Sequence, residues 1–451
     1  MRVRLGVDVG RVTTVAVLVG PGGQTVARAV VDSVPGLGES LRAVLAALPG
    51  DRIGEVDAVG LTTDLERRPS RLRPVAALRI APPSHPSLGP LADWPPQAAR
   101  EVGPLHAVVP GGSALTGRQL APLDRTAVAD FARRAADDGV TAFSVAAAGA
   151  LTRPDPELAA AEVIAEAVPG AEITLSHELG RSGLRERENT GVLNAALRPW
   201  AARVSDAAER ALRVGGLRAP LHLARNTGGL VSVAYFRRYP VLAIASTTAS
   251  AVRGAALAAG ADRAVVVDAG AAEFRCASVT DGEAESSDVG PGLGGVDLDL
   301  ARIRTDVLPR ADLVLTGTEQ IAELVARVRR RAPGGVLLAA GGDCGLVPVR
   351  AQDPAAAIAA AAYGAARSDI VAEVDQVAVA EGRDELDRLL GLAGDQALAR
   401  VVAAGAAPAT ARVAFAAHTP VSYLPEGVHR LRVRAVGSPT GNPVMTRGRR
   451  T

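Results

Sequence analysis

The chain has 451 residues, of which 48% are hydrophobic, so it is long enough for two or more domains with buried cores. Its formal net charge of +2 gives no reason to expect a nucleic-acid or membrane partner, and no apolar run is long enough for a membrane-spanning helix. Every strongly basic side chain is Arg, which excludes a lysine nucleophile. Only Cys276 and Cys344 occur, which favours a reducing, cytoplasmic compartment over a disulfide framework.

The first predicted element is a strand, a tight turn and a second strand over residues 5–23. It begins Leu-Gly-Val-Asp-Val-Gly, continues as an apolar run and ends in Gly-Pro-Gly-Gly, typical of a hairpin turn. The carboxylate of Asp8 on the rim of the first turn, with Gly10 in its floor, can hold a phosphate together with Mg²⁺. The structural alternative is an ordinary Val-Asp-x-Gly at the end of a buried strand.

The elements that follow alternate between strands and helices, which indicates a parallel or mixed sheet covered by helices. The segment 66–103 is rich in Pro and Arg and reads as irregular apart from a strand candidate at Val75–Ile80. In chain order the others are a strand within 51–63, a helix that Asp124 caps, strand Val140–Ala148, a helix from Asp155, strand Ala171–Ser176 and a helix over 185–213 with a break near Pro199.

A second lobe is expected from about Ala219. The strand–turn–strand pattern recurs there, and Asp268 aligns with Asp8, Gly270 with Gly10 and Gly282 with Gly22 without a gap. Two copies predict two lobes that clamp one nucleotide. The other elements predicted here are strands Pro220–Leu223, Val241–Ala245, Ala264–Val267, Phe274–Val279 and Gly334–Ala340, helices Ala249–Ala259 and 354–366, and, towards the C-terminus, a helix, strand Arg430–Val436 and a frayed tail over 438–451.

Longer motifs give a family resemblance that covers most of the chain except about 284–333. Residues 174–198 contain Ser-His-Glu, an Arg- and Glu-rich step and an Asn-Ala helix, and residues 226–232 read Asn-Thr-Gly-Gly-Leu-Val-Ser. Arg253-Gly254-Ala255-Ala256 and Tyr423-Leu-Pro, the latter followed by 431–437, come next in the same order. In these motifs the chain resembles the hydantoinase A/oxoprolinase family.

The resemblance implies an α/β, two-lobed, actin-like ATPase fold with duplicated ribonuclease H-like mixed sheets. It divides the chain into an N-terminal lobe (1–180), a second lobe with linking helices (181–382) and a C-terminal segment (383–451). It implies an ATP-dependent hydrolase, or a subunit of one, that uses ATP and Mg²⁺ to open cyclic amides such as 5-oxoproline or hydantoins. A B-type partner subunit and a homo-oligomer are both open.

The implied site has four parts. The expected residues are Asp8, Asp268, His177 and Glu178 for catalysis, Asp8 and Asp268 for metal, Gly10, Arg11, Thr13, Thr14, Gly270, Gly341, Gly342 and Asp343 for nucleotide, and Arg225, Asn226 and Gly228 for substrate. His177 and Glu178 can equally be hydrogen-bonded residues at a strand end.

The chain departs from the family pattern in both phosphate loops. Arg11 replaces a second glycine, and it either blocks close approach of a phosphate or supplies a guanidinium to it. Glu273 adds negative charge beside the expected phosphates unless Arg275 or a metal offsets it. Hydroxyls and carboxylates of the family are also missing at 12, 15, 272, 274 and 275. The alternative function is therefore a catalytically degenerate scaffold or regulatory subunit, with a small-molecule kinase as a third reading.

Overall fold

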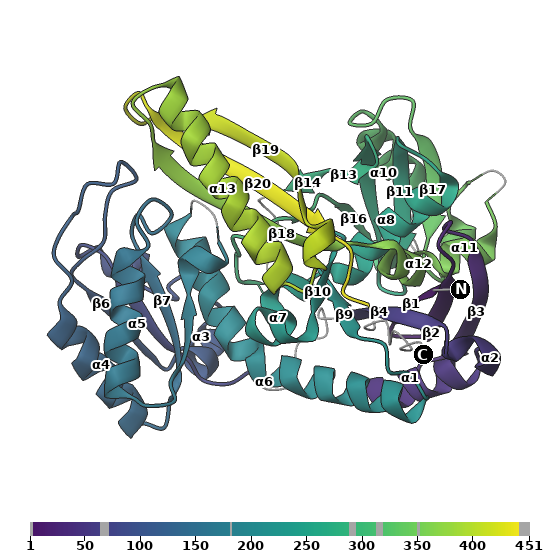
Figure 1. The fold of residues 1–451 in the computed structure, drawn as a ribbon, viewed down its shortest axis with the longest axis horizontal. Coiled ribbons are helices and arrows are strands. Elements are labelled where there is room, and N and C mark those ends of the chain that lie inside the picture. The colour runs from purple at the N-terminus through teal and green to yellow at the C-terminus, as the bar shows by residue number, and fades with distance from the viewer. Residues whose placement is uncertain are drawn as a thin grey trace, which may run out of the picture.

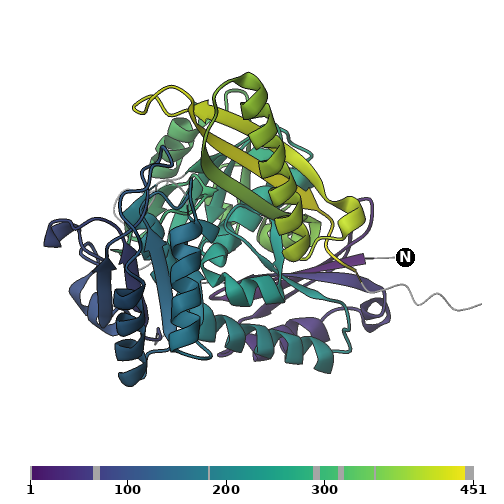
Figure 2. The same cartoon turned by 60° about the vertical axis from the view of Figure 1, so that its left-hand side comes forward.

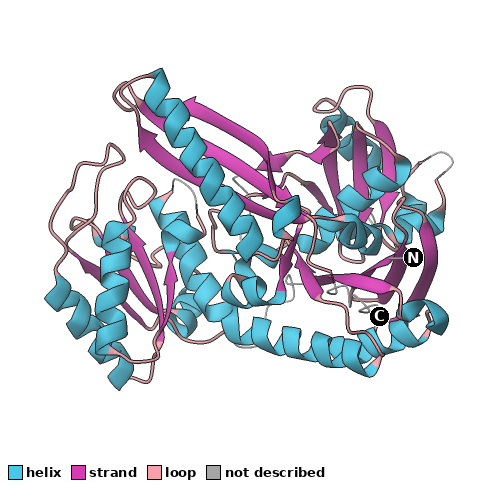
Figure 3. Ribbon diagram, viewed as in Figure 1, coloured by secondary structure: helices cyan, strands magenta, loops and turns pink. Residues whose placement is uncertain are grey.

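The computed structural model describes residues 3–63, 72–180, 183–287, 295–312, 319–349 and 352–441. Within these residues the chain builds a nine-stranded, a five-stranded, a four-stranded and a two-stranded sheet, and helices pack against the three larger sheets (Figures 1 and 3). No helix among the described residues combines the length and apolar character that crossing a membrane requires.

The first lobe is built on the nine-stranded sheet. Its strands lie in the order β19-β20-β18-β10-β9-β4-β1-β2-β3. Their bounds are β1 Val3–Val9, β2 Thr13–Val19, β3 Thr25–Asp32, β4 Val56–Thr63, β9 Leu221–Ala224, β10 Leu230–Ser232, β18 Ile370–Val379, β19 Arg412–Pro420 and β20 Val428–Gly437. Strand β1 pairs antiparallel with β2 and parallel with β4, which places it at the centre of the N-terminal part.

The second lobe repeats this arrangement in the order β13-β12-β11-β17. The strands are β11 Ala264–Ala269, β12 Glu273–Thr280, β13 Glu283–Ala284 and β17 Val336–Ala340, with β16 Asp306–Pro309 beside β12. Strand β11 pairs antiparallel with β12 and parallel with β17, as β1 does with β2 and β4. The expected duplicated, actin-like architecture with mixed sheets is therefore confirmed.

A separate unit between β4 and β9 contains the four-stranded parallel sheet (Figure 2). Its order is β6-β5-β7-β8, with β5 Ala76–Ile80, β6 Leu105–Val109, β7 Ala142–Ala147 and β8 Glu172–Leu175. Helices α3 Pro96–Val102, α4 Arg125–Asp137 and α5 Asp155–Ala167 belong to it. Asp124 caps α4 as predicted, because its carboxylate accepts a 2.9 Å hydrogen bond from the amide of Ala127.

The remaining helices cover the two larger sheets. They are α1 Leu37–Ala46, α2 Gly50–Ile53, α6 Leu184–Val214, α7 Val233–Arg238, α8 Ser246–Ala259, α10 Glu319–Arg329, α11 Pro354–Ile358, α12 Ala360–Arg367 and α13 Arg383–Ala403. Figure 1 shows α6 running from the four-stranded unit to α1 along the lower edge of the molecule. The short strands β14 Ser286–Ser287 and β15 Arg302–Ile303 form the two-stranded sheet.

Glycines let helix α12 lie directly between the two lobes. A Cβ on Gly6 of β1 would overlap the carbonyl oxygen of Ala362, and a Cβ on Gly60 of β4 would overlap that of Ala365. The contact between α12 and α8 is equally close, because a Cβ on Gly364 would overlap the carbonyl oxygen of Ser250. The two lobes are therefore joined by backbone packed against backbone, which larger residues would push apart.

Several predicted elements differ in the structure. The segment Val241–Ala245 is not a strand, because Pro240–Ala243 forms a 3₁₀ helix. Helix α6 runs through Pro199 without a break, since the carbonyl of Ala195 that Pro199 leaves free accepts a 2.9 Å hydrogen bond from Nε of Arg73. The Ala-rich helix is divided between α11 and α12. Strands β18 and β19 were not predicted, and the expected frayed tail lies outside the described residues from 442 onwards.

The nine-stranded sheet contains strands from all three of the expected segments, 1–180, 181–382 and 383–451. The nine-stranded sheet combines β1–β4 with β9, β10 and β18 and with the C-terminal hairpin β19–β20. The three-part division of the chain stays a proposal, and the observed sheets show how tightly the chain ends are tied to the first lobe.

Candidate functional site

A cavity of about 390 Å³ lies between the first and second lobes. Both predicted turns line it, together with the first turn of α8 and the turn after β17. The chemistry-bearing residues on its wall are Asp8, Gly10, Arg11, Thr13, Thr247, Thr248, Asp268, Gly270, Glu273, Arg275, Gly341, Gly342 and Asp343. The structure thus brings together residues that are far apart in the chain and that the two copies of the motif predicted to face one cleft.

The first turn is closed by its own backbone. The amide of Gly10 donates a 3.1 Å hydrogen bond to the carbonyl of Thr13, which leaves Arg11 and Val12 exposed at the tip. Asp8 accepts a hydrogen bond from the hydroxyl of Thr62 on the neighbouring strand β4. Thr14 does not line the cavity, since it is fully buried and its hydroxyl bonds that of Ser33 at 2.8 Å.

The second turn has the same closure and carries a charge pair. The amide of Gly270 donates a 3.1 Å hydrogen bond to the carbonyl of Glu273. The Glu273 carboxylate forms an ion pair with Arg275, which also donates a 2.7 Å hydrogen bond to the hydroxyl of Thr248 on α8. The negative charge that the sequence placed beside the expected phosphates is therefore offset by a neighbouring guanidinium.

The turn after β17 approaches the second loop closely. Gly341 has φ +85°, and a Cβ there would lie 2.5 Å from the carbonyl oxygen of Ala269 and 3.0 Å from a carboxylate oxygen of Asp268. Asp343 forms an ion pair with Arg310. Sequence analysis did not find Arg310, because no local pattern connects it with residue 343.

The start of α8 closes the cavity with polar groups. The chain enters this 14-residue helix through Ala245, whose φ of 60° is left-handed. Among the described residues, the buried hydroxyl of Thr247 has no hydrogen-bond partner. A helix N-terminus attracts anions, so a phosphate here would also satisfy this hydroxyl. Sequence analysis noted Ser246-Thr247-Thr248 only as a departure from the family, although hydroxyl residues before an apolar helix are a signal of a helix start.

The donor set suits a phosphate-bound magnesium ion better than a metal held by protein alone. Among the described residues, no group of three or more His, Cys, Asp or Glu side chains is arranged to hold a metal. Asp8 and Asp268 line the same cavity, and Mg²⁺ is commonly bound by one or two carboxylates together with phosphate oxygens and water. The residues present therefore fit a magnesium–nucleotide complex.

His177 and Glu178 lie outside this cavity, at the end of β8 in the four-stranded unit. The ring Nδ1 of His177 is 2.7 Å from a carboxylate oxygen of Glu157. Burial alone would raise the pKa of Glu157, but its contacts with His177, Arg187 and Ser176 together hold this pKa below its usual value. Glu178 accepts a 2.7 Å hydrogen bond from the hydroxyl of Tyr239. The structure does not bring these two residues to Asp8 and Asp268.

The predicted substrate residues belong to the loop between β9 and β10. Arg225 donates a 2.8 Å hydrogen bond to the carbonyl of Val371. The backbone amide of Asn226 donates a 2.7 Å hydrogen bond to the carbonyl of Leu242, and Gly228 has φ +88°. Their neighbour Thr227 lines a separate cavity of about 200 Å³. The proposed substrate contact thus falls at a different place from the interlobe cavity.

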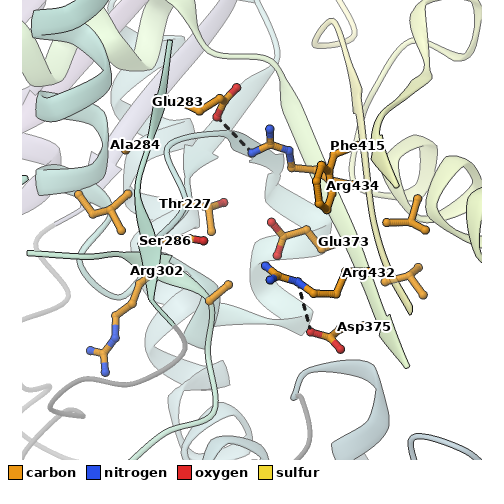
Figure 4. Close-up of a pocket in the computed structure, with 14 residues that line it drawn as sticks. Thr227, Glu283, Ala284, Ser286, Arg302, Glu373, Asp375, Phe415, Arg432 and Arg434 are labelled. Carbon is orange, nitrogen blue, oxygen red and sulfur yellow. Dashed lines mark hydrogen bonds and ion pairs between the residues drawn. The ribbon is translucent and has the colours of Figure 1, made fainter. Parts of the chain in front are cut away.

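Charged side chains surround this separate cavity (Figure 4). They are Glu283, Arg302, Glu373, Asp375, Arg432 and Arg434. Strand β12 leads from Glu273, at the interlobe cavity, to Thr280, which pairs with Glu283. At about 3.3 Å per residue this strand spans roughly 23 Å, so the two cavities lie at opposite ends of the second lobe.

Comparison with known proteins finds a family match for part of the chain that lines the interlobe cavity. Residues 187–332 match the family model described as hydantoinase/oxoprolinase. Over this segment the chain is similar to the hydantoinase/oxoprolinase family. This segment includes most of α6, the loop at Asn226, the start of α8 and the second turn with Asp268, so it supplies part of the second-lobe wall of the cavity. A comparison with curated proteins gives no match.

Two solved structures resemble the whole fold. An ATP-dependent caprolactamase from Pseudomonas jessenii superposes with a TM-score of 0.73 at 15% identity, covering 96% of this chain and 87% of that one. A nucleotide-free acetone carboxylase gives a TM-score of 0.65 at 13% identity, covering 97% of this chain and 88% of that one. At these identities the likeness establishes the fold alone.

Proposed function

We propose that the chain is an ATP-dependent enzyme, or an enzyme subunit, that opens small cyclic amides such as 5-oxoproline or hydantoins. The observation that carries this proposal is the interlobe cavity, which is lined by Asp8, Asp268 and the first turn of α8. The family of residues 187–332 and the fold likeness to an ATP-dependent caprolactamase support the reaction class. The cyclic amide itself is a proposal.

The residues on the cavity wall divide the proposed nucleotide site into regions. Asp8 and Asp268 would hold Mg²⁺, and the first turn of α8 with Thr247 would face the phosphates. Gly341 and Gly342 would lie beside the nucleoside, next to the apolar side chains that α11 and α12 add to the wall. When bound, MgATP would supply the phosphoryl group that makes a poorly electrophilic amide reactive towards water.

Paired charges make the altered loops compatible with a polyphosphate. Arg275 offsets Glu273, and Arg310 offsets Asp343, so two of the carboxylates near the site have guanidinium partners. The backbone at position 11 does not need the conformational freedom of a glycine, because Arg11 is not among the described non-glycine residues with positive φ. The backbone hydrogen bond between Gly10 and Thr13 that closes the turn does not involve the exposed side chain of Arg11. This guanidinium can therefore donate hydrogen bonds to a phosphate.

One observation favours the alternative of a nucleotide-binding subunit without turnover. Val12, which stands where the family has a threonine, lines the cavity and is 60% exposed. It offers no hydroxyl to a metal, water or phosphate. Such a subunit would bind MgATP and regulate or support a catalytic partner, for which a B-type subunit is the proposed candidate. A homo-oligomer is equally a proposal.

The cytoplasm is the proposed location of the protein. Cys276 is buried and Cys344 partly buried, and both are free thiols. Free cysteines are typical of a reducing compartment.

The deciding experiment measures ADP release with a panel of lactams, imides and hydantoins, with and without a B-type subunit. We expect amide-dependent ADP release from the wild type and a loss of about 10²–10³-fold in Asp8→Asn and Asp268→Asn. Asp130→Asn, which alters an exposed carboxylate on α4, is the matched control and should keep full activity. MgATP binding without amide-dependent turnover in the complete complex would instead support the regulatory alternative.

A further inference from the structure

Strand β20 presents two arginines on the face that points away from the core. Leu431 and Val433 are at most 2% exposed and pack in the core. Successive side chains of a strand point to opposite faces, so Arg432 and Arg434 share the other face, roughly 7 Å apart along the strand. Both line the cavity of about 200 Å³ near Thr227, the charged cavity (Figure 4).

The charged cavity lies between segments of the two lobes. Strands β18 and β20 of the nine-stranded sheet form one wall, and β13 of the second lobe and the sheet β14–β15 form the other. An ion pair of 3.1 Å between Arg434 and Glu283 joins the two walls. The charged cavity has about half the volume of the interlobe cavity, so it suits a ligand smaller than a nucleotide.

The two arginines keep hydrogen-bond donors that the protein itself does not use. Arg430 holds Asp375 through hydrogen bonds of 2.8 and 2.6 Å, and Arg432 stays 3.9 Å from the same carboxylate. Within the described residues the guanidinium of Arg432 makes no hydrogen bond, and the buried Nε of Arg434 has no partner. Because a guanidinium carries five N–H donors in a planar fork, the two side chains can still bind a carboxylate group.

Acceptors for a cation lie beside these donors. Glu373 on β18 is opposite Arg434 in the strand register, and Glu283 lies on the other wall. The hydroxyl oxygen of Thr227 is buried and, among the described residues, has no hydrogen-bond partner. Figure 4 shows the Glu373 carboxylate turned towards Thr227. An ammonium group has three donors and would satisfy this hydroxyl, which is destabilising while it stays buried without a partner.

We propose that the charged cavity binds a small amino acid in its zwitterionic form, at a site that does not depend on the proposed hydrolase activity. Arg432 and Arg434 bind its carboxylate, and Glu373 and Thr227 bind its ammonium group. The charges of the wall balance, because three side chains are acidic and three are basic: Glu283, Glu373 and Asp375 against Arg302, Arg432 and Arg434. A zwitterion keeps this balance, whereas a ligand with a single charge adds an uncompensated one to a partly enclosed cavity.

The same charges also pair across the strands. Arg434 lies opposite Glu373 and Arg432 opposite Asp375, and such pairs stabilise a sheet. Strand pairing accounts for the alternation of sign. In the described part of the chain it still leaves the guanidinium of Arg432 and the hydroxyl of Thr227 without hydrogen bonds beside an open cavity. A ligand with one group of each sign satisfies both.

Calorimetric titration without nucleotide tests the ligand class. We would titrate the whole chain with glycine, β-alanine and γ-aminobutyrate, and with three relatives of the last, namely butyrate, butylamine and its five-membered lactam. We expect at least one of the amino acids to bind at one site per chain, and each relative to bind about tenfold more weakly or worse. No binding of any amino acid at millimolar concentration would overturn the proposal. So would a lactam or a singly charged relative that binds as tightly as the best amino acid.

Variants of the wall locate the bound amino acid. Arg432→Gln should weaken binding about tenfold or more, and Thr227→Val about threefold. Arg133→Gln is the matched control, because Arg133 pairs with Asp130 on the exposed face of α4 and does not line this cavity, and it should bind as the wild type does. Circular dichroism and the melting temperature without ligand show that each variant folds. Unchanged affinity in both Arg432→Gln and Thr227→Val would overturn this site. The readout is binding without nucleotide, so a failure of the proposed hydrolase would not affect it.

Discussion

Asp8 and Asp268 are the last-but-one residues of equivalent central strands in two sheets, and both line one cavity. Each strand pairs antiparallel with the strand that follows and parallel with a later one. Both turns line this cavity together with residues of α8 and α12. The duplicated sequence pattern therefore becomes a two-sided acidic site only through the packing of the two lobes.

Arg275 should be needed for nucleotide binding as long as Glu273 carries its negative charge. Arg275→Gln leaves a carboxylate facing the proposed phosphates, so we expect the Kd for MgATP to rise about tenfold, which corresponds to about 1.4 kcal/mol. The double variant Glu273→Gln/Arg275→Gln should recover most of this loss. Isothermal titration of the wild type, the two single variants and the double variant measures the coupling, and additive effects would show that the pair does not act on the nucleotide.

The unpartnered hydroxyl of Thr247 predicts opposite effects on stability and on binding. A buried hydroxyl without a partner destabilises the free protein, so Thr247→Val should raise the free energy of unfolding by about 1 kcal/mol. The same change should weaken MgATP binding, because the helix start loses a donor. Thr152→Val is the control, since the hydroxyl of Thr152 already donates a 3.0 Å hydrogen bond to the carbonyl of Leu115. Its loss should destabilise the protein without changing the affinity for nucleotide. Chemical denaturation and titration of both variants check this, and unchanged binding in Thr247→Val would remove this residue from the site.

The contact between α8 and α12 should tolerate no side chain at Gly364. The added methyl group of Gly364→Ala would overlap the carbonyl oxygen of Ser250, so we expect a loss of about 1–3 kcal/mol in the free energy of unfolding. Gly391→Ala provides the contrast, because nothing lies within 4 Å of a Cβ on this exposed residue of α13. It should stabilise the protein by about 0.5–1 kcal/mol. Urea midpoints measure both, and equal effects would contradict the close packing.

Histidine 222 should make the protein less stable in mild acid. Burial lowers the pKa of His222 to about 4, from a usual value of 6.5. Between these values the unfolded chain binds the proton and the folded chain does not, so stability falls as the pH drops from 6.5 towards 4. A shift of this size corresponds to about 3 kcal/mol. The pH dependence of unfolding in wild type and His222→Leu measures this contribution, and a slope that is the same in both would exclude His222 as its source.

Local pattern was enough to predict the two central hairpins. Strands β1, β2 and β11 are largely apolar and β12 is mixed, but each pair flanks an Asp-x-Gly turn, and a short tight turn forces the strands that flank it to pair. The cap at Asp124 was predicted for the same reason, since a cap depends on neighbours within one turn. Such features need no knowledge of distant parts of the chain.

Features that depend on distant segments were missed. Strand β18 alternates buried and partly exposed residues, a signal that could have been read, but its place beside β10 and β20 depends on distant segments, since Ile370 pairs with Leu230 and Val379 with Val428. The continuity of α6 at Pro199 depends on Arg73, which satisfies the carbonyl that the proline leaves free. Arg310 reaches Asp343 only because β16 joins β12.

A thermal-shift titration with MgATP tests the central claim most directly, because a ligand that binds only the folded protein stabilises it in proportion to ln(1 + [L]/Kd). Wild type and the control Asp130→Asn should melt at higher temperature as MgATP is added, with stabilisation of about 2.7 kcal/mol at a hundredfold excess over Kd. Asp8→Asn and Asp268→Asn should each lose most of this shift. An unchanged melting temperature of the wild type at millimolar MgATP would contradict the nucleotide cleft.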